Sequence, residues 1–123
     1  MEFALVSLAF VMMLLGVIEL GRYYFTAEAV RTITAEAARA TLIYYRTHNG
    51  ACPSQDTIKT TALLKAPYLG STGLILTVTC ATDTNGAKTL QVSASYPFST
   101  SVPWLKQLTA IADDSRVVVD PNS

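Results

Sequence analysis

Hydrophobic residues follow two different patterns along the first third of the chain. From Phe3 to Ile18 no residue is charged, and Ser7 carries the only hydroxyl. From Val30 to Tyr44 apolar residues instead recur at spacings of three and four, the pattern of one buried helix face. No proline interrupts Phe3 to about Thr47, so the pattern predicts one continuous helix of roughly 70 Å, apolar in its first half and amphipathic in its second. The expected buried positions of the second half are Val30, Ile33, Ala37, Ala40 and Tyr44.

The chain after this helix carries the signals of a second, short helix. Thr47-His48-Asn49-Gly50 is expected to end the long helix, because Asn and Gly readily adopt the left-handed conformation of a C-cap. Ser54 or Asp56 is placed to cap a helix that runs to about Lys65 and stops before Pro67. The expected apolar positions of this helix are Ile58, Ala62, Leu63 and Leu64.

Stretches later in the chain predict a small antiparallel sheet. Leu74–Ala81 and Leu90–Tyr96 alternate as half-buried strands do, and Asp83–Gly86 between them is typical of a hairpin turn. Trp104–Thr109 is expected to form a helical turn and Arg116–Asp120 a last strand. The predicted fold is therefore α+β, with one long N-terminal helix packed on a small antiparallel sheet and a short extra helix in the connecting loop.

The apolar N-terminal segment must be buried in a bilayer or against other copies of itself. A cleavable signal peptide is excluded, because an acid (Glu2) precedes the run and Glu19-Leu20-Gly21-Arg22 follows it. A bilayer core of about 30 Å needs around 20 residues, and the run is barely long enough even with Leu20 and Gly21. A carboxylate such as Glu2 beside an apolar run has a high free-energy cost unless it is paired, and its presence there therefore indicates a function. The pattern predicts a membrane anchor that later becomes the core of a filament.

Charge and cysteine content narrow the possibilities further. The 123 residues include nine basic and nine acidic ones, so the chain has no net positive charge that would attract nucleic acid. The two cysteines, Cys52 and Cys80, lie outside the apolar segment and suit one disulfide in an oxidising compartment. Such a bridge is worth roughly 3–4 kcal/mol to a small domain. The alternative is a pair of reduced core thiols.

Three Glu-x-x-Arg pairs recur along the long helix, at Glu19/Arg22, Glu28/Arg31 and Glu36/Arg39. Each spacing allows an i,i+3 ion pair worth a few tenths of a kcal/mol on an exposed face. The pairs are interpreted either as a solvated helix side or as bridges to neighbouring subunits.

Other polar and aromatic residues give no catalytic pattern. His48 is interpreted as an exposed C-cap residue, and Asp113-Asp114 has no third ligand nearby in the sequence. No phosphate-binding loop or nucleophile elbow occurs, so we expect no enzyme, no cofactor and no metal site. The aromatic and proline cluster is interpreted as core packing or as an exposed adhesive patch, and consists of Tyr96, Phe98, Pro103 and Trp104.

Both ends of the chain resemble a known family. Glu2-Phe3-Ala4-Leu5-Val6, followed by the apolar run and Gly16-Val-Ile-Glu-Leu-Gly-Arg22, resembles the N-terminus of TadE-like pilins. These are minor pilins or pseudopilins of the tight-adherence (Tad, Flp) branch of type IV pili. Leu90–Phe98, which ends in Tyr-Pro-Phe, is similar to a strand of that family, and Leu108–Ala112 with Arg116–Asp120 is similar to its closing strand. The middle of the chain carries no part of the resemblance.

The resemblance implies a structural subunit of a Tad-like pilus. It would be inserted in the bacterial inner membrane and then polymerised through its N-terminal helix into an extracellular filament that serves adhesion or a related surface role. Residues 1–22 would be the transmembrane and filament-core half of the helix, and residues 23–123 the globular pilin domain. The implied partners are copies of itself or other pilins, the inner membrane, a prepilin peptidase and the pilus assembly machinery, with no nucleic acid. The runner-up is a membrane-anchored extracytoplasmic binding module that does not polymerise.

The resemblance also assigns roles near the N-terminus. Glu2 would pair with the terminal amine of a neighbouring subunit, with the Met1 amine as partner; the alternative places Glu2 among lipid headgroups. In such pilins a prepilin peptidase cuts after a glycine upstream of the Glu-Phe pair, so the resemblance implies either that the sequence is a mature or trimmed form or that the cut falls immediately before Met1. Phe3–Ile18 would form the filament core, or else serve as a monomeric anchor. The residues expected at subunit contacts are Met1, Glu2, Phe3, Leu5, Val6, Phe10, Leu14, Glu19 and Arg22.

Overall fold

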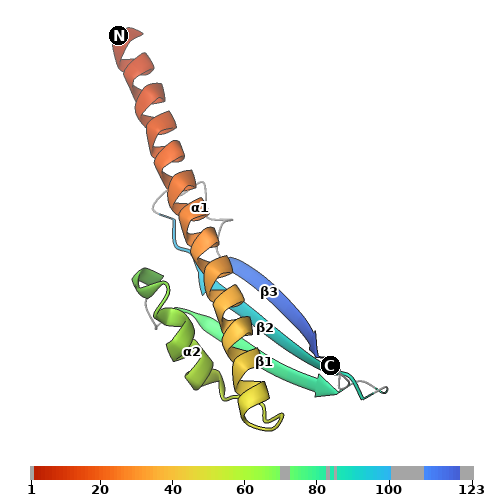
Figure 1. Ribbon diagram of the computed structural model, residues 1–123. Helices are drawn as coiled ribbons and strands as arrows, with labels where there is room; N and C mark the ends of the chain where they lie inside the picture. The colour runs from red at the N-terminus through yellow and green to blue at the C-terminus, as the bar shows by residue number, and fades with distance from the viewer. Residues whose placement is uncertain (1, 70–72, 83, 85, 101–109, 120–123) are drawn as a thin grey trace.

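The molecule is built on one long helix whose N-terminal half projects away from all other elements (Figure 1). The computed structural model describes residues 2–69, 73–82, 84, 86–100 and 110–119, with the backbone alone at residues 2, 110 and 118. Its elements are α1 (Glu2–Thr47), α2 (Gln55–Leu63), the 3-10 helix η1 (Pro67–Leu69), β1 (Ile75–Thr82), β2 (Lys88–Pro97) and β3 (Ala110–Val119). The predicted α+β architecture is confirmed.

Helix α1 has 46 residues and is continuous through Gly16 and Gly21. It ends as predicted, because Asn49 and Gly50 have φ values of 51° and 81° in the left-handed region. The amide of Gly50 donates a hydrogen bond of 2.9 Å to the carbonyl of Tyr45 and so satisfies one carbonyl at the helix end.

Helix α2 begins at the predicted cap. Ser54 is extended, and its hydroxyl oxygen accepts a hydrogen bond from the Thr57 amide. Ile58 and Ala62 are buried, as expected from their spacing. The prediction that Leu64 is an apolar packing position is wrong, because α2 ends at Leu63 and the Leu64 side chain is 77% exposed.

The three strands form one antiparallel sheet in the order β1-β2-β3. Strand β2 is central, and Val92 pairs with Val78 of β1 on one side and with Ser115 of β3 on the other. The last strand begins at Ala110 rather than at the predicted Arg116, because its first half is defined by pairing with β2. Part of the predicted hairpin turn and the whole predicted helical turn at 104–109 lie outside the described residues.

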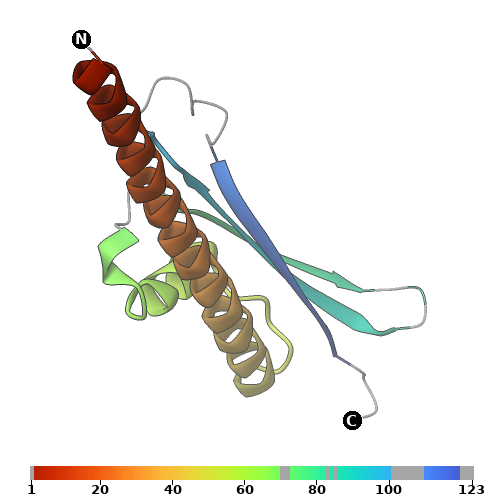
Figure 2. The same cartoon turned by 90° about the horizontal axis from the view of Figure 1, so that it is seen from above.

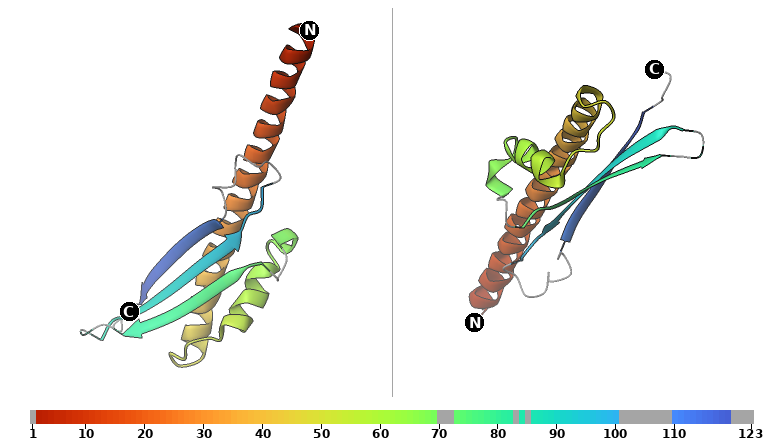
Figure 3. Two further views of the ribbon diagram at one scale, coloured as in Figure 1. Left: turned by 180° about the vertical axis from the view of Figure 1, so that it is seen from behind. Right: turned by 90° about the horizontal axis from the view of Figure 1, so that it is seen from below.

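Helices cover one face of the sheet, and the other face points away from them (Figures 2 and 3). The second half of α1 supplies the buried residues Val30, Ile33 and Ala37, which belong to the same core cluster as Val92 and Ala94 of β2. Two buried threonines of α1 satisfy their own hydroxyls: Thr34 donates to the carbonyl of Val30 and Thr41 to that of Ala37. The predicted amphipathic pattern therefore holds, with Ala40 and Tyr44 only partly buried at its margin.

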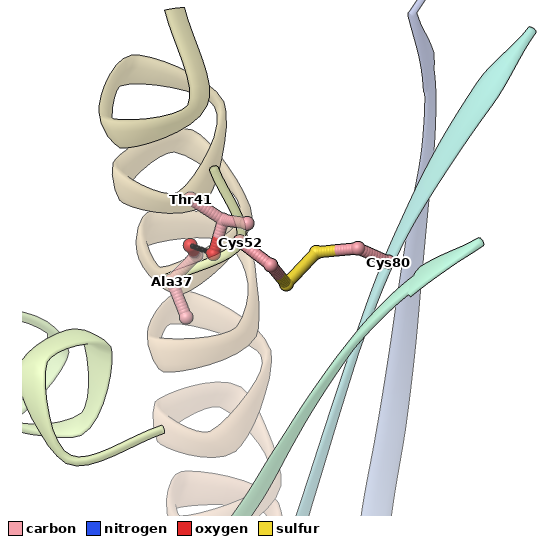
Figure 4. Close-up of a disulfide and its surroundings, with 4 residues drawn as sticks. All are labelled: Ala37, Thr41, Cys52 and Cys80. Atoms are coloured by element: carbon pink, nitrogen blue, oxygen red, sulfur yellow. Dashed lines mark hydrogen bonds between the residues drawn. A yellow bond between two sulfur atoms is a disulfide. The ribbon is translucent and has the colours of Figure 1, made fainter. Parts of the chain in front are cut away.

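A disulfide joins the loop after α1 to β1 (Figure 4). It links Cys52 to Cys80, whose Cα atoms lie 6.2 Å apart. Both residues are exposed, and the bridge approaches α1 near Thr41 and Ala37 in the close-up. This pairing is the one expected from the sequence, and no free thiol is found among the described residues.

Candidate functional site

The first half of α1 exposes apolar side chains on every side. Consecutive residues from Val11 to Leu15 are all exposed, so the helix has no buried stripe in this part. Phe3 is 86% exposed and Phe10 61%. The helix is long and apolar enough to cross a membrane by length and composition. A helix that is apolar all round is one that becomes buried, in a bilayer or in a protein core.

The sequence-predicted contact residues of this half fall into two groups. Those on the described helix surface are exposed in the single chain and comprise Phe3, Leu5, Val6, Phe10 and Leu14. At the start of the helix, Glu2 is described by its backbone alone and Met1 lies outside the described residues. The pairing of Glu2 with an amine therefore stays a prediction.

The one hydroxyl in the apolar run is satisfied within the helix. The Ser7 hydroxyl donates a hydrogen bond of 2.9 Å to the carbonyl of Ala4. In a hydrocarbon environment a polar group without a partner costs several kcal/mol, and this local bond removes that cost. The segment is thus fit for burial in lipid or against apolar protein.

The end of the apolar run is joined to the globular part at a neck of four residues, Glu19, Arg22, Tyr23 and Phe98. A nitrogen of the Arg22 guanidinium donates to a carboxylate oxygen of Glu19 at 2.9 Å. The same guanidinium lies 6.0 Å from the ring centroid of Phe98, and the Tyr23 ring meets Phe98 edge-on at 5.4 Å. Because Phe98 directly follows β2, these contacts fix the sheet to α1 where the helix leaves the globular part.

Burial at the neck differs from what the sequence suggested. The solvated interpretation of the Glu-x-x-Arg pairs is wrong for Glu19, whose side chain is 4% exposed while that of Arg22 is 55% exposed. The position of Glu19 directly after the apolar run was a sign of burial in the sequence. Its actual burial, however, depends on tertiary contacts that the sequence pattern does not give. A buried carboxylate needs a charged or hydrogen-bonded partner, so Arg22 is structurally important here.

Of the other two Glu-x-x-Arg spacings, only Glu28/Arg31 forms an ion pair on the surface. Glu28 and Arg31 approach to 3.8 Å and both are exposed. In the part of the chain that the structure describes, no ion pair joins Glu36 and Arg39. Exposed pairs of this kind contribute at most about 1 kcal/mol.

Groups that could support chemistry are not brought together among the described residues. No group of three or more potential metal ligands forms in that part of the chain. The His48 ring stacks on Tyr44 at 4.0 Å, and its Nδ1 atom lies 3.1 Å from the carbonyl of Tyr44 at the helix end. Asp113 and Asp114 are neighbours in a strand, so their side chains point to opposite faces of the sheet. A carboxylate oxygen of Asp114 accepts a hydrogen bond from the side-chain Nε2 of Gln91.

The predicted aromatic cluster lies partly within the described residues. Phe98 is buried in the core and Tyr96 packs against the core at its margin. Pro103 and Trp104 lie outside the described residues. Core packing is therefore the correct interpretation for Phe98.

A hollow of about 410 Å³ lies on the open face of the sheet. It is lined mainly by short side chains such as Thr77, Ser93 and Ser95, together with Ile75 and Asp114. Its lining residues include no nucleophile–base pair. The apolar half of α1 is therefore the stronger candidate site.

Comparison with known proteins gives one match. Residues 1–39 match the family model described as TadE-like protein. No curated protein and no solved structure matches the chain. The resemblance stated from the N-terminal residues is thereby confirmed over this segment, and it indicates an association with the Tad pilus. TadE-like proteins are of a structural, pilus-associated type.

Proposed function

We propose, starting from its TadE-like N-terminal segment, that this chain is a structural subunit of a Tad-like type IV pilus. It is inserted in the bacterial inner membrane through the first half of α1 and then polymerised through that same half into an extracellular filament. Residues 1–22 act as the membrane and filament-core part, and residues 23–123 as the globular pilin domain. The filament serves adhesion or a related surface role.

One observation carries the proposal. The helix is continuous for 46 residues, yet only its second half is buried by the sheet and by α2. The first half exposes apolar side chains from Phe3 to Ile18, and water is a poor solvent for such a surface. Its span, with Leu20 and Gly21, is roughly 28 Å, just under the thickness of a bilayer core of about 30 Å. A marginal span suits a segment that must leave the membrane.

Polymerisation gives the apolar half a second place of burial. Identical helices packed side by side remove the same side chains from water that lipid removed before. The contact residues proposed for this packing are Phe3, Leu5, Val6, Phe10 and Leu14. Arg22 lies at the exposed rim of the neck, and we propose that it and Glu19 mark the boundary between the filament core and the globular domain.

Glu2 is the residue to which we assign the register of assembly. A carboxylate without a partner among apolar helices costs several kcal/mol, whereas one paired with the terminal amine of a neighbouring subunit costs much less and fixes its position. The Met1 amine is the proposed partner. The other partners are copies of this chain or other pilins, a prepilin peptidase and the pilus assembly machinery.

The test of this assignment is Glu2→Ala in cells that assemble the pilus. We expect sheared surface filaments to lose the chain while the membrane fraction keeps it. The matched control is Glu28→Ala, which removes an exposed glutamate of the globular domain and is expected to leave filaments unchanged. Unchanged incorporation of the Glu2→Ala chain would refute the role of Glu2. A wild-type chain that stays wholly in the membrane fraction, with no filaments, would instead favour a non-polymerising anchored module.

A further inference from the structure

Two large aromatic rings meet on the surface of the globular domain rather than in its core. Phe25 of α1 and Tyr68 of η1 have ring centroids 5.2 Å apart at an angle of 32°. Phe25 is nevertheless 62% exposed and Tyr68 59% exposed. Paired rings usually gain most of their stabilisation from burial, so the exposed pair indicates a surface that is covered by a partner or a membrane.

The position of this pair along α1 indicates that it lies at the depth of the lipid headgroups. Leu20 is the last large apolar residue of the proposed span, which ends at Gly21, and Phe25 lies five residues beyond Leu20, roughly 7.5 Å along the helix axis. Each headgroup layer of a bilayer is about 5–8 Å thick outside the hydrocarbon core. If the apolar run fills the core, Phe25 and its partner Tyr68 lie in the headgroup layer, where aromatic side chains are enriched.

The turn between α2 and η1 adds an apolar and a basic residue at the same end of the molecule. Leu64 is 77% exposed, and Lys65 beside it is exposed as well. Figures 1 and 3 show that this turn and η1 form the end of the α2 arm nearest to the N-terminal half of α1. Exposed apolar groups beside a basic side chain suit contact with the interface of a bilayer, where the lysine meets lipid phosphate.

Charges nearby agree with that partner. Arg22 lies on the membrane side of Phe25, where its half-exposed guanidinium is paired with Glu19 at 2.9 Å, and the exposed Lys65 lies in the turn after α2. The nearest acid on α1 beyond Phe25 is Glu28, one turn farther from the apolar run and within 3.8 Å of Arg31. Arg22 therefore stands closer to the expected phosphate layer than the Glu28–Arg31 pair does, and Lys65 adds an exposed positive charge beside Leu64.

We propose that Phe25, Leu64, Lys65 and Tyr68 form a collar that rests on the headgroup layer of an anionic phospholipid bilayer. The inserted subunit then has two membrane contacts, the span itself and the collar, and the globular domain is held at a fixed tilt before extraction into a filament. This inference rests on the proposed membrane insertion of α1.

The test uses the full chain in liposomes of phosphatidylcholine and phosphatidylglycerol. A single introduced cysteine carries a fluorophore, and quenching is measured with lipids that bear a nitroxide on the headgroup and, in parallel samples, with lipids that bear it on the acyl chain. The probe sites are Leu64→Cys in the collar, Leu14→Cys in the span, and Ala35→Cys as the control. Ala35 is exposed on the same helix, roughly 22 Å beyond Leu20. The native cysteines are in a disulfide and are not labelled.

We expect headgroup nitroxides to quench the probe at 64 several-fold more than the probe at 35. In the same chain, Tyr68→Ser should reduce quenching at 64 by at least half, whereas Ile43→Ser should not. Ile43 is a matched control because it is an exposed apolar residue outside the collar. Replacing phosphatidylglycerol with phosphatidylcholine should lower the quenching at 64 as well.

Three results would overturn the collar. Equal quenching at 64 and 35, with the probe at 14 quenched by chain-labelled lipid, would reject the collar and keep the membrane span. A probe at 14 that no nitroxide lipid quenches would reject the span and the collar together. If the probe at 64 is not quenched by nitroxide lipid, and becomes less exposed to water as the protein-to-lipid ratio is raised, a second copy of the chain covers the surface instead.

Discussion

The two halves of α1 have the same backbone and opposite surroundings. In the second half, Val30, Ile33 and Ala37 are fully buried against the sheet and α2. In the first half, side chains of equal or greater size are exposed on every side of the helix. The comparison shows that the globular domain needs only the second half for its own core. The apolar surface of the first half is therefore available to lipid or to other subunits.

The strongest test of this comparison places the same charge in both halves. Ile33→Asp puts an unpaired carboxylate in the core, which costs several kcal/mol. Because the whole unfolding free energy of a domain is only about 5–15 kcal/mol, this change should abolish cooperative unfolding of the globular domain. Leu14→Asp should leave that unfolding unchanged and oppose membrane insertion by about 2.5–3.5 kcal/mol. Urea unfolding followed by aromatic fluorescence and flotation of membranes measure the two effects. A Leu14→Asp chain that unfolds the globular domain would contradict the account.

Loss of the disulfide should be the next largest effect. The Cys52→Ser/Cys80→Ser double variant opens a loop with a sequence separation of 28. The chain-entropy estimate for such a loop is roughly 3–4 kcal/mol of unfolding free energy. Urea unfolding of the double variant and of the oxidised wild type measures the difference. Equal stability of the two proteins would mean that the bridge does not constrain the unfolded chain.

A smaller effect is expected at the neck, where the two halves meet. Glu19→Gln removes the charge from a buried side chain and weakens its bond to Arg22, so we expect a loss of about 1–3 kcal/mol of unfolding free energy. Glu28→Gln removes an exposed charge from an equivalent pair and should change stability by about 0.5 kcal/mol or less. Equal losses in the two variants would show that burial of Glu19 has no energetic consequence.

The smallest effect is expected at Leu64. Leu64→Ser should change the unfolding free energy of the globular domain by about 0.5 kcal/mol or less, because the side chain packs on little in the single chain. Ile58→Ala, a buried change in the same arm, should cost about 2–5 kcal/mol. The pair is measured by urea unfolding. A large loss on Leu64→Ser would mean that this side chain packs against the globular domain.

Local signals were sufficient for much of the fold. The absence of proline, the change from an all-apolar run to a three-and-four spacing, and the Asn-Gly end predicted α1 almost to the residue. Ser54 as a cap and the alternation of β2 were equally local. These features depend on backbone conformation and on one buried face, both of which neighbouring residues in the sequence determine.

Features set by distant segments were harder to predict. The first half of β3 contains Asp113 and Asp114, which disfavour a strand locally, and its pairing with β2 decides its structure. The contacts of Tyr23 with Phe98 and of Phe25 with Tyr68 also join segments far apart in the sequence. Of the candidate site, the sequence identified the apolar run, but it contained no sign of the neck contact with Phe98 or of the exposed pair beside α2.

The most direct test of the central claim is the reactivity of one cysteine, Leu14→Cys, toward a small water-soluble maleimide. It is measured in isolated membranes, in sheared filaments that contain the chain, and after unfolding in detergent, with Ala35→Cys as an exposed reference. We predict that the cysteine at 14 is unreactive in both membranes and filaments and reacts only after unfolding, whereas the cysteine at 35 reacts in isolated membranes. A cysteine at 14 that reacts in filaments, or a chain that never leaves the membrane fraction, would contradict the proposal that the first half of α1 is buried twice.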